Sequence, residues 1–137
     1  MQITPYLFFD GRCEEAIEFY RETLDAEVTM LLRFKDNPEP PTESPASPES
    51  AEKVMHGSLR IGETEIYLSD GCCTGQPSFQ GFALSIARSD TEQAARTFAA
   101  LADGGQVRMP MAKTFFSPAF GMVADRFGVP WMVITTS

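Results

Sequence analysis

The order of strand-like and helix-like segments repeats once along the chain, and this repeat constrains the fold more than any other feature. In the first half, the apolar patterns predict a strand at 3–9, a helix at 13–24 and strands at 27–34, 54–61 and 64–70. In the second half, they predict a strand at 81–87, a helix at 91–102 and strands near 106–112, 120–126 and 131–135. The sequence therefore indicates two tandem βαβββ modules, at about residues 1–71 and 80–137.

Matching residues and end signals support the duplication. A shift of 78 residues places Tyr20 on Phe98, and a shift of 66 places the turn at 60–62 on the turn at 126–128. Glycine and glutamate at 62–63 predict a two-residue hairpin turn. Asp90 is a good N-cap for the second helix. A single unrepeated α+β sandwich is the alternative, and the matches favour two modules.

A proline-rich acidic segment at 36–52 interrupts the first module. It holds five prolines, five acidic residues, no basic residue and nothing apolar larger than alanine. Proline removes backbone donors, and this composition offers little apolar surface to bury. We interpret the segment as an extended surface loop that the fold tolerates, with a partner-binding loop as the alternative. The length of 137 residues suits one domain, 1–137, that contains both modules.

Charge and apolar patterning exclude several classes of protein. The formal net charge is −8, and an acidic surface repels phosphate backbones, so we expect no nucleic-acid partner. No run of about 18 apolar residues predicts a membrane span, and early acidic residues argue against a secretory signal. An odd number of cysteines, three, favours reduced thiols in the cytoplasm. Outside 36–52 the chain carries 14 acidic and 11 basic residues, so most of the net charge belongs to that segment.

The cysteines form no known motif. Cys72 and Cys73 are adjacent and lack the CxxC spacing of redox or zinc sites. Cys13 begins the first helix, where the helix N-terminus is expected to lower the pKa of a thiol. We interpret both placements as chance.

Three motifs carry a family resemblance. They are PYLFFDGRCEEAIEFY at 5–20, MHGSLRIG at 55–62 and FGMVADRFGVPWMV at 120–133. Together they resemble the vicinal-oxygen-chelate superfamily, which includes glyoxalase, bleomycin resistance and dioxygenase proteins, and within it the PhnB-like branch. The resemblance covers nearly the whole chain apart from 36–52. It implies an α+β fold in which two tandem βαβββ modules form one cup-shaped mixed sheet with helices on its outer face, and in which two chains form a homodimer.

The resemblance also implies where a metal would bind. Metal-dependent members hold a divalent cation with four inward-facing His and Glu side chains. The matching positions here are Pro5, Tyr67, Ala83 and Val133, which are not metal ligands. We therefore expect no cofactor and no metal, while a divalent ion held weakly by His56 and a nearby carboxylate is the disfavoured alternative.

Strand alternation from Tyr67 predicts which side chains face into the cup. The hairpin turn pairs Arg60 with Glu65 and Ser58 with Tyr67, and a period of two then separates the two faces of the sheet. The residues expected to line a ligand pocket are Leu7, Phe9, His56, Ser58, Arg60, Glu65, Tyr67, Ser69, Met122, Ala124 and Arg126. The residues expected to face the helices are Leu59, Ile61, Ile66 and Leu68.

His56 is the only histidine and the candidate for acid/base catalysis near neutral pH. The alternative is a buried imidazole bound to a hydroxyl such as that of Ser69. Arg60 and Arg126 are expected either to form ion pairs with Glu65 and Asp125 or, where one is unpaired, to clamp an anion.

Aromatic side chains in the second module have two interpretations. Trp131 fits core packing better than ligand stacking, and Phe115 and Phe116 lie in a segment, 113–122, that resembles the rim loop of the family.

Two hypotheses for function follow from these observations. In the first, the chain is a PhnB-like protein of unassigned activity that binds a small anionic or aromatic molecule in its cup without the usual metal quartet. In the second, it is an enzyme of the lyase, transferase or dioxygenase type that uses His56 as acid/base or as a metal ligand. Proteins of this branch are often labelled methyltransferases, but no glycine-rich strand–turn–helix is present to bind a nucleotide-like cofactor.

Overall fold

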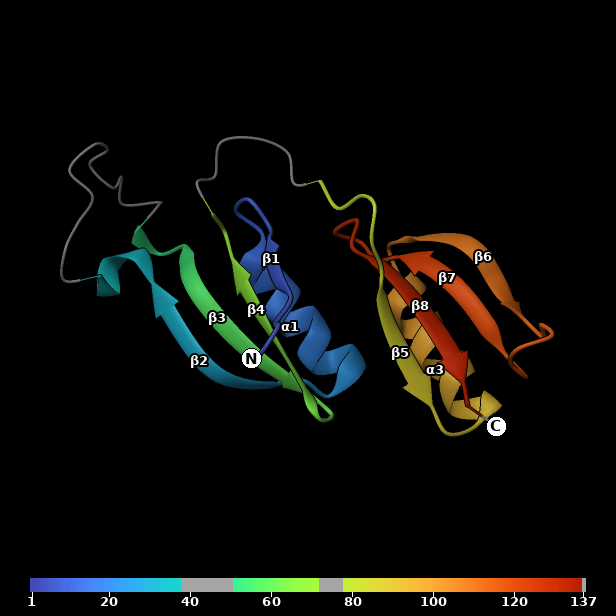
Figure 1. Ribbon diagram of the computed structural model, residues 1–137. Coiled ribbons are helices and arrows are strands. Elements are labelled where there is room, and N and C mark those ends of the chain that lie inside the picture. Colours follow the sequence, from blue (N-terminus) through green and yellow to red (C-terminus); the bar gives the residue numbers. More distant parts are fainter. Residues whose placement is uncertain (38–50, 72–77, 137) are drawn as a thin grey trace. The chain divides into compact units, whose positions relative to one another are not determined.

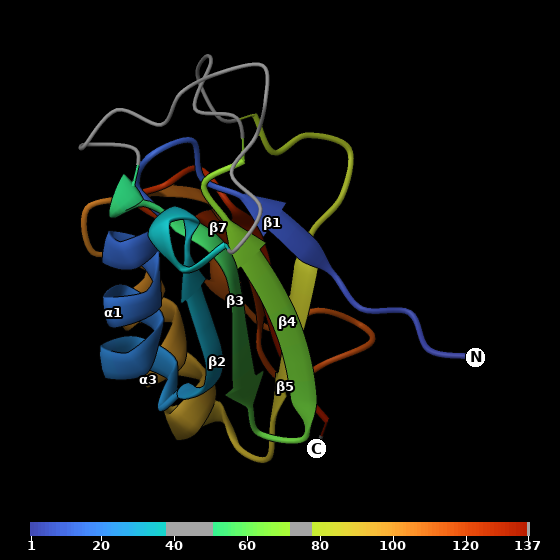
Figure 2. The ribbon, with the colours of Figure 1, turned by 90° about the vertical axis from the view of Figure 1, so that its left-hand side faces the viewer.

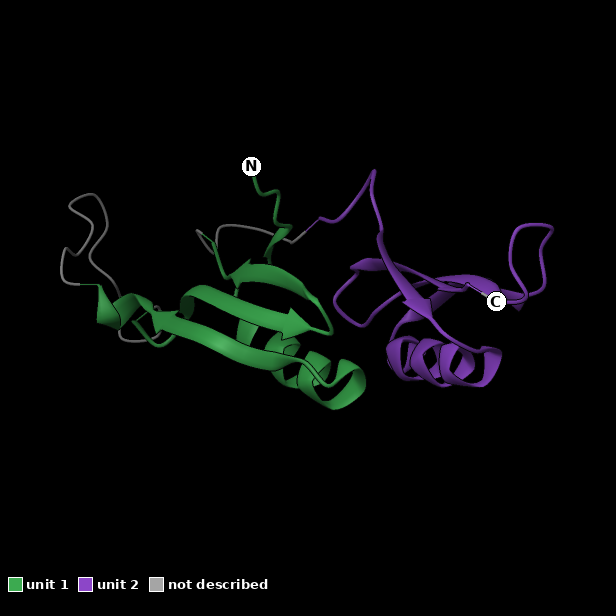
Figure 3. Ribbon diagram, turned by 60° about the horizontal axis from the view of Figure 1, so that its bottom comes forward, with its two compact units in different colours: residues 1–77 green, residues 78–137 purple. Residues whose placement is uncertain are grey.

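The computed structural model describes residues 1–37, 51–71 and 78–136. It divides into two compact units, Met1–Pro77 and Ser78–Ser137 (Figure 3). The bounds of the units lie close to those of the two predicted modules.

The first unit packs a helix against a four-stranded mixed sheet (Figures 1 and 2). Its elements in chain order are β1 (Tyr6–Phe8), α1 (Cys13–Leu24), β2 (Glu27–Arg33), the short 3-10 helix η1 (Phe34–Asp36), β3 (Val54–Ile61) and β4 (Thr64–Ser69). The strand order is β1-β4-β3-β2, with β1 parallel to β4 and the other neighbours antiparallel.

The second unit repeats this arrangement. Its elements are β5 (Leu84–Arg88), α3 (Thr91–Ala102), β6 (Gln106–Ala112), β7 (Phe120–Ala124) and β8 (Pro130–Thr135). The strand order is β5-β8-β7-β6, again with a parallel first pair. The predicted α+β class and the tandem βαβββ order are therefore confirmed.

The local signals in the sequence account for the helices and the hairpin. On α1, the side chains at helical spacing that face the sheet, Ala16, Ile17 and Tyr20, are buried. The N-cap of α3 is Asp90, whose carboxylate accepts a hydrogen bond from the backbone N–H of Gln93 at 2.7 Å. Both helices have the predicted bounds, and strands β3 and β4 are joined at the predicted turn.

The core of the first unit lies between α1 and one face of its sheet. A Cβ atom added to Gly57 would lie 3.5 Å from Cδ1 of Ile17, so the odd-numbered residues of β3 face α1. Leu59 and, across the register on β4, Ile66 and Leu68 are buried on this face. The predicted orientation of these three leucine and isoleucine side chains is confirmed.

The predicted orientation of the first strand is wrong. Leu7 pairs with Leu68, and paired residues share a face, so Leu7 faces α1 and is only 3% exposed. Phe9 is fully buried, with its ring 6.3 Å from that of Tyr20. Leu7 and Phe9 therefore belong to the core, and the opposite face of the sheet carries Tyr6 and Phe8 instead.

Two buried carboxylates close the turns of the fold. Asp70 accepts hydrogen bonds from the backbone N–H groups of Gly11 (2.7 Å), Cys13 (2.9 Å) and Val54 (2.8 Å), which ties the β1–α1 turn to the start of β3. Asp125 accepts hydrogen bonds from the backbone N–H groups of Phe127 and Val129 and from the indole N–H of Trp131, the last at 2.9 Å. Trp131 is buried, so the interpretation of core packing is confirmed.

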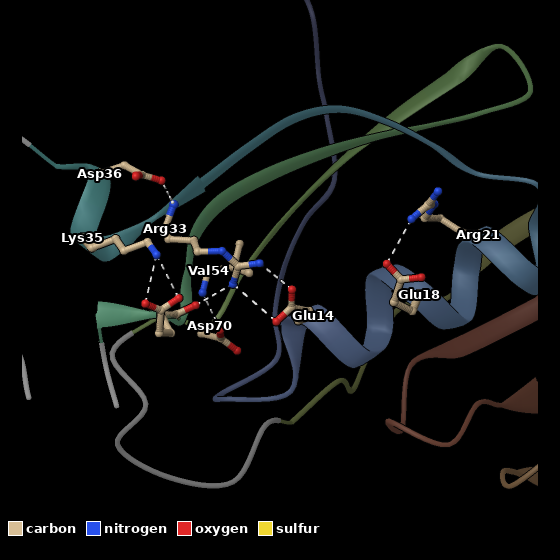
Figure 4. Close-up of polar contacts among 9 residues, drawn as sticks. Glu14, Glu18, Arg21, Arg33, Lys35, Asp36, Val54 and Asp70 are labelled. Carbon is tan, nitrogen blue, oxygen red and sulfur yellow. Dashed lines mark hydrogen bonds and ion pairs between the residues drawn. The ribbon is translucent and has the colours of Figure 1, made fainter. Parts of the chain in front are cut away.

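A group of surface ion pairs lies where β2 ends and β3 begins (Figure 4). The guanidinium of Arg33 donates to the carboxylate of Glu14 and, at 2.6 Å, to the backbone carbonyl of Glu52. The ammonium of Lys35 donates to the carboxylate of Glu52 at 2.9 Å. These contacts link the two ends of the acidic segment to α1, whereas residues 38–50 lie outside the described part of the chain.

Several element bounds differ from the predicted ones. The first strand begins at Tyr6 rather than at residue 3, and β5 begins at Leu84 rather than at 81. Strand β7 ends at Ala124 because Asp125 starts a turn, in which its carbonyl accepts from the N–H of Gly128 at 2.9 Å. In the described residues, no helix has the length and apolar character needed to cross a membrane.

Candidate ligand-binding site on the first sheet

The face of the first sheet opposite α1, here called the aromatic face, brings most of the predicted site residues together. The register between its strands places their side chains in rows. One row holds Glu27, Arg60 and Glu65, and the next holds Met30, Ser58, Tyr67 and Tyr6. Beyond them, Leu32 pairs with His56, and Phe8 pairs with Ser69. The predicted grouping of His56, Ser58, Arg60, Glu65, Tyr67 and Ser69 on one face thus agrees with the register, while their role in binding stays a prediction.

Four aromatic rings form a cluster on this face. The rings of Tyr6 and Phe8 are stacked, with centroids 4.9 Å apart and an interplanar angle of 15°. Tyr67 contacts Tyr6 edge-on at 5.7 Å and contacts the His56 ring at 5.1 Å. Tyr6 is 40% exposed and Phe8 is 53% exposed, so the cluster presents aromatic surface. Such surface can stack on a planar ligand.

A hydrogen bond holds the imidazole of His56 in place. Its Nδ1 atom lies 2.8 Å from the hydroxyl oxygen of Tyr6, and the tautomer of the ring decides which group donates. Among the described residues, none forms a hydrogen bond with Nε2 of His56. The hydroxyl that binds His56 is therefore that of Tyr6 and not that of Ser69, whose Oγ accepts from the N–H of Gly71 at 2.9 Å. Burial raises the pKa of Tyr6.

A short chain of hydroxyl groups leads to a carboxylate on the same face. The hydroxyl of Thr29 donates to Oγ of Ser58 at 2.8 Å, and Ser58 donates to Oε1 of Glu65 at 2.7 Å. In the described part of the chain, no side chain binds the second carboxylate oxygen of Glu65 or the hydroxyl of Tyr67. These two atoms and Nε2 of His56 are polar groups that a ligand on this face could bind.

Both arginines have carboxylate partners, but not the predicted ones. Arg60 forms an ion pair with Glu27, directly opposite on β2, instead of with Glu65. Arg126 donates to the backbone carbonyl and the carboxylate of Asp103, at 3.2 and 3.3 Å. It therefore contacts the C-terminal end of α3, and the expectation that it faces the opposite side of the sheet is wrong.

The other predicted site residues of the second unit lie on β7. A Cβ atom on Gly121 would lie 2.8 Å from the Phe98 ring of α3, so Gly121 faces the helix and Met122 faces away from it, as predicted. Val133 pairs with Gly121 and is buried against α3, so the expected inward orientation of this metal-ligand position is wrong. Ala124 is buried at the end of β7.

Neither the positions that match the metal ligands of the family nor the described thiol adds a reactive group to this site. The carbonyl of Pro5 accepts from the N–H of Tyr67 at 2.9 Å, which places these two positions side by side. In residues 1–37, 51–71 and 78–136, no three His, Cys, Asp or Glu side chains are grouped to hold a metal ion. Cys13 is buried, and its burial together with the nearby Asp70 carboxylate raises the pKa of its thiol, so the expected lowering is wrong. Cys72 and Cys73 lie outside the described residues.

Sequence reasoning missed Tyr6 and Phe8, which complete the aromatic cluster. No local signal pointed to them, because the face on which they lie is set by the parallel pairing of β1 with β4, in which Tyr6 lies beside Tyr67.

Comparisons with known proteins agree with this fold. The family model described as 3-demethylubiquinone-9 3-methyltransferase matches residues 1–134. The chain is 35% identical to protein YjdN of Escherichia coli (strain K12) over 140 residues, which cover 97% of this chain and 94% of YjdN. The crystal structure of PA1353 from Pseudomonas aeruginosa is 38% identical, covers 98% of this chain and 97% of its own, and superimposes with a TM-score of 0.84.

A further solved structure is the PhnB protein from Bacillus cereus, with 25% identity, coverage of 98% of this chain and 99% of its own, and a TM-score of 0.80. More distant structures, titled as glyoxalase-related or glyoxalase/bleomycin resistance protein/dioxygenase family enzymes, share the fold alone. The doubled βαβββ fold is thus that of the glyoxalase/bleomycin resistance/dioxygenase, or vicinal-oxygen-chelate, class. Within that class, the chain belongs to the PhnB-like family that the matching model describes as 3-demethylubiquinone-9 3-methyltransferase.

Proposed function

We propose that this protein binds a small aromatic molecule on the aromatic face of its first sheet. The observation that carries the proposal is the cluster of Tyr6, Phe8, His56 and Tyr67, which present stacked and edge-on rings from three adjacent strands. A planar ligand that stacks on these rings buries apolar surface on both partners.

Polar groups beside the rings support specific recognition. Nε2 of His56, the Tyr67 hydroxyl and one oxygen of Glu65 have no hydrogen bond to a described residue. A few convergent polar groups on a mainly apolar surface are the usual composition of a small-molecule site. The expectation of an anionic ligand rested on Arg60 and Arg126, and both are now paired, so the aromatic class is the one we retain.

The remaining proposals concern cofactors and assembly. We propose that binding uses no metal quartet, because the matched positions hold Pro5, Tyr67, Ala83 and Val133. We also propose a cytoplasmic homodimer without a nucleic-acid partner, supported by the family resemblance, the cysteine usage and the net charge of −8. Sedimentation at micromolar concentration tests the dimer, and metal analysis of protein purified without added metal tests the cofactor proposal.

Titration of isotope-labelled protein with a panel of aromatic fragments, followed by NMR, tests the main proposal. We expect shifts of backbone signals in β1, β3 and β4, and loss of binding in the Tyr67→Leu and Phe8→Leu variants. Phe116→Leu is the matched control, because it removes from the second unit a ring that is as exposed as that of Phe8, 53% in both cases. Binding that survives both variants on the first sheet, or that is equally reduced by the control, would show that the ligand site lies elsewhere.

An enzymatic role for His56 is the second candidate. It is favoured by one observation, the bond between Tyr6 and Nδ1, which orients the imidazole while its Nε2 stays available for proton transfer. Mass spectrometry of any bound fragment after incubation separates the two functions. A chemically unchanged ligand supports binding alone, whereas conversion by the native protein but not by His56→Gln supports catalysis.

A further inference from the structure

We propose that the ligand of the aromatic face is an organic cation, namely an aromatic ring that carries a quaternary or protonated ammonium group. This inference rests on the proposed function, since it names the chemical class that the same face takes. The distribution of charge between the two units, the pairing of charges on the face and the exposed rings support it.

The acidity of the chain is confined to its first unit. Residues 1–77 contain fifteen acidic and six basic side chains, a formal net charge of −9, whereas residues 78–137 contain four acidic and five basic ones, a net charge of +1. The segment at 36–52 does not explain this difference alone. Without it the first unit still has ten acidic and six basic residues. A ligand that approaches the first sheet therefore enters a negative field, which concentrates cations and repels anions.

The charges on the face itself have the same sign. The register places Arg60 on this face, where it is paired with Glu27, and Arg33 at the end of β2 is paired with Glu14 of α1. Glu65 lies in the same row, and one of its carboxylate oxygens is bound by Ser58. The other oxygen has no bond to a described residue. An anion on this face would meet this carboxylate, whereas a cation would pair with it.

The aromatic rings also prefer a cation. The face of a phenol or benzene ring carries the negative part of its quadrupole and attracts an ammonium group within about 6 Å. Glu65 and Tyr67 are two residues apart on β4, so their side chains project from the same face roughly 7 Å apart. Tyr6 lies next to Tyr67 across the register. A ring stacked on Tyr6 and Phe8 can thus place an attached ammonium between Tyr67 and Glu65.

Three probes with one ring and different charge test the inference. They are benzyltrimethylammonium, benzyl alcohol and phenylacetate, titrated into the full chain at low ionic strength and followed by NMR or calorimetry. We expect the cation to bind most tightly, the alcohol more weakly and the phenylacetate weakest. The affinity for the cation should fall as salt is added, because exposed charges are screened beyond about 10 Å at 0.1 M salt.

Two conservative variants separate a local contact from the general field. Glu65→Gln keeps an oxygen that can accept the hydrogen bond of Ser58, so the sheet should fold normally. It should weaken binding of the cation about 2–5-fold and leave the alcohol unchanged. Glu63→Gln is the matched control, since it removes the same charge from an exposed position in the adjacent turn and should change affinity less than twofold. Tyr67→Leu should cost a further factor of about 2–5.

The outcomes distinguish this inference from the proposed function. Tightest binding of the cation, reduced by Glu65→Gln and not by Glu63→Gln, supports both. Binding of phenylacetate or benzyl alcohol that equals or exceeds that of the cation overturns the cationic class and leaves the aromatic site standing. No binding of any probe or of the wider fragment panel refutes the site itself.

Discussion

The buried carboxylate of Asp70 offers the sharpest test of how the first unit is held together. Its Oδ1 atom accepts from the backbone N–H groups of Gly11 and Cys13, and its Oδ2 atom accepts from that of Val54. The side chain is almost fully buried, so water does not replace these bonds. The change Asp70→Asn keeps one carbonyl oxygen but turns an NH2 group toward one of the three donors.

The magnitude follows from the bonds that are lost or weakened. An unpaired buried N–H costs about 1–3 kcal/mol, and bonds to a neutral oxygen are each about 1 kcal/mol weaker than bonds to a carboxylate. A neutral amide is easier to bury than a charge, which offsets part of this loss. We therefore expect Asp70→Asn to lower the free energy of unfolding by about 2–4 kcal/mol. For a chain of this length, the loss corresponds to a fall in Tm of roughly 8–15 °C.

Urea unfolding followed by circular dichroism measures this loss, with thermal unfolding as a second readout. Glu63→Gln is the control, because it removes one negative charge from an exposed turn and should change stability by about 0.5 kcal/mol or less. If Asp70→Asn unfolds within 0.5 kcal/mol of the native chain and at the same slope against urea, the carboxylate does not hold the β1–α1 turn, and the reasoning fails.

Two further predictions concern ionisable groups. Burial and the Asp70 carboxylate raise the pKa of Cys13. In a Cys72→Ser/Cys73→Ser double variant, which leaves Cys13 as the single thiol, this thiol should resist alkylation in the folded protein and react only on unfolding. Stability should also fall by at most about 1.4 kcal/mol per pH unit once the pH rises above the ordinary thiol pKa of about 8.5, and a Cys13→Ala variant that keeps this slope would contradict the assignment. The Arg33 hydrogen bond lowers the pKa of Glu14, so the bond should stabilise the fold above the ordinary carboxyl pKa and lose its effect as the pH falls through the lowered pKa of Glu14. Since the pair is largely exposed, Glu14→Gln should cost about 0.5 kcal/mol or less at pH 7 and progressively less as the pH is lowered, as measured by thermal unfolding over a series of acidic pH values.

The helices, the hairpin and the doubled order of elements could be predicted because each rests on local patterns. The helix at 13–24 has a long amphipathic period, and the helix at 91–102 has in addition a capping aspartate that accepts the expected backbone bond. A two-residue turn fixes the register of its hairpin, and the turn at 62–63 therefore predicted that Ser58 pairs with Tyr67 and Arg60 with Glu65. These features need no information from distant parts of the chain.

The orientation of the first strand could not be predicted in the same way. The run YLFF at 6–9 is apolar at every position, so alternation does not indicate which side chains face the helix. The turn that connects this strand to α1 also has an irregular backbone, with positive φ angles of 50° at Asp10 and 104° at Gly11. The phase is set by the parallel pairing of Leu7 with Leu68, which is a contact between residues far apart in sequence.

The partners of the arginines also depended on three-dimensional arrangement. Glu27 and Glu65 both lie beside Arg60 in one row of the sheet, on opposite neighbouring strands. The sequence predicted Glu65 as the partner of Arg60, because the hairpin turn already fixed the register between these two strands. In the structure Glu65 is bound by Ser58, and Arg60 pairs with the carboxylate on β2. Two carboxylates at equal register distance cannot be ranked without their other contacts.

The two units differ in the chemistry of the sheet face opposite their helix, and this difference supports the proposed site on the first unit. Both have the same strand order and a helix of equal length, so the fold does not distinguish them. On the face opposite the helix, the first unit carries exposed rings, a histidine and carboxylates, whereas the second carries the buried ring of Phe120 and methionines paired across β7 and β8, Met122 with Met132. Thioether side chains adapt to many apolar shapes but supply neither charge nor proton transfer. If the proposed site is correct, selectivity for a charged ligand comes from the first unit, and exchanging Met122 or Met132 for leucine should leave the preference between cation and anion unchanged.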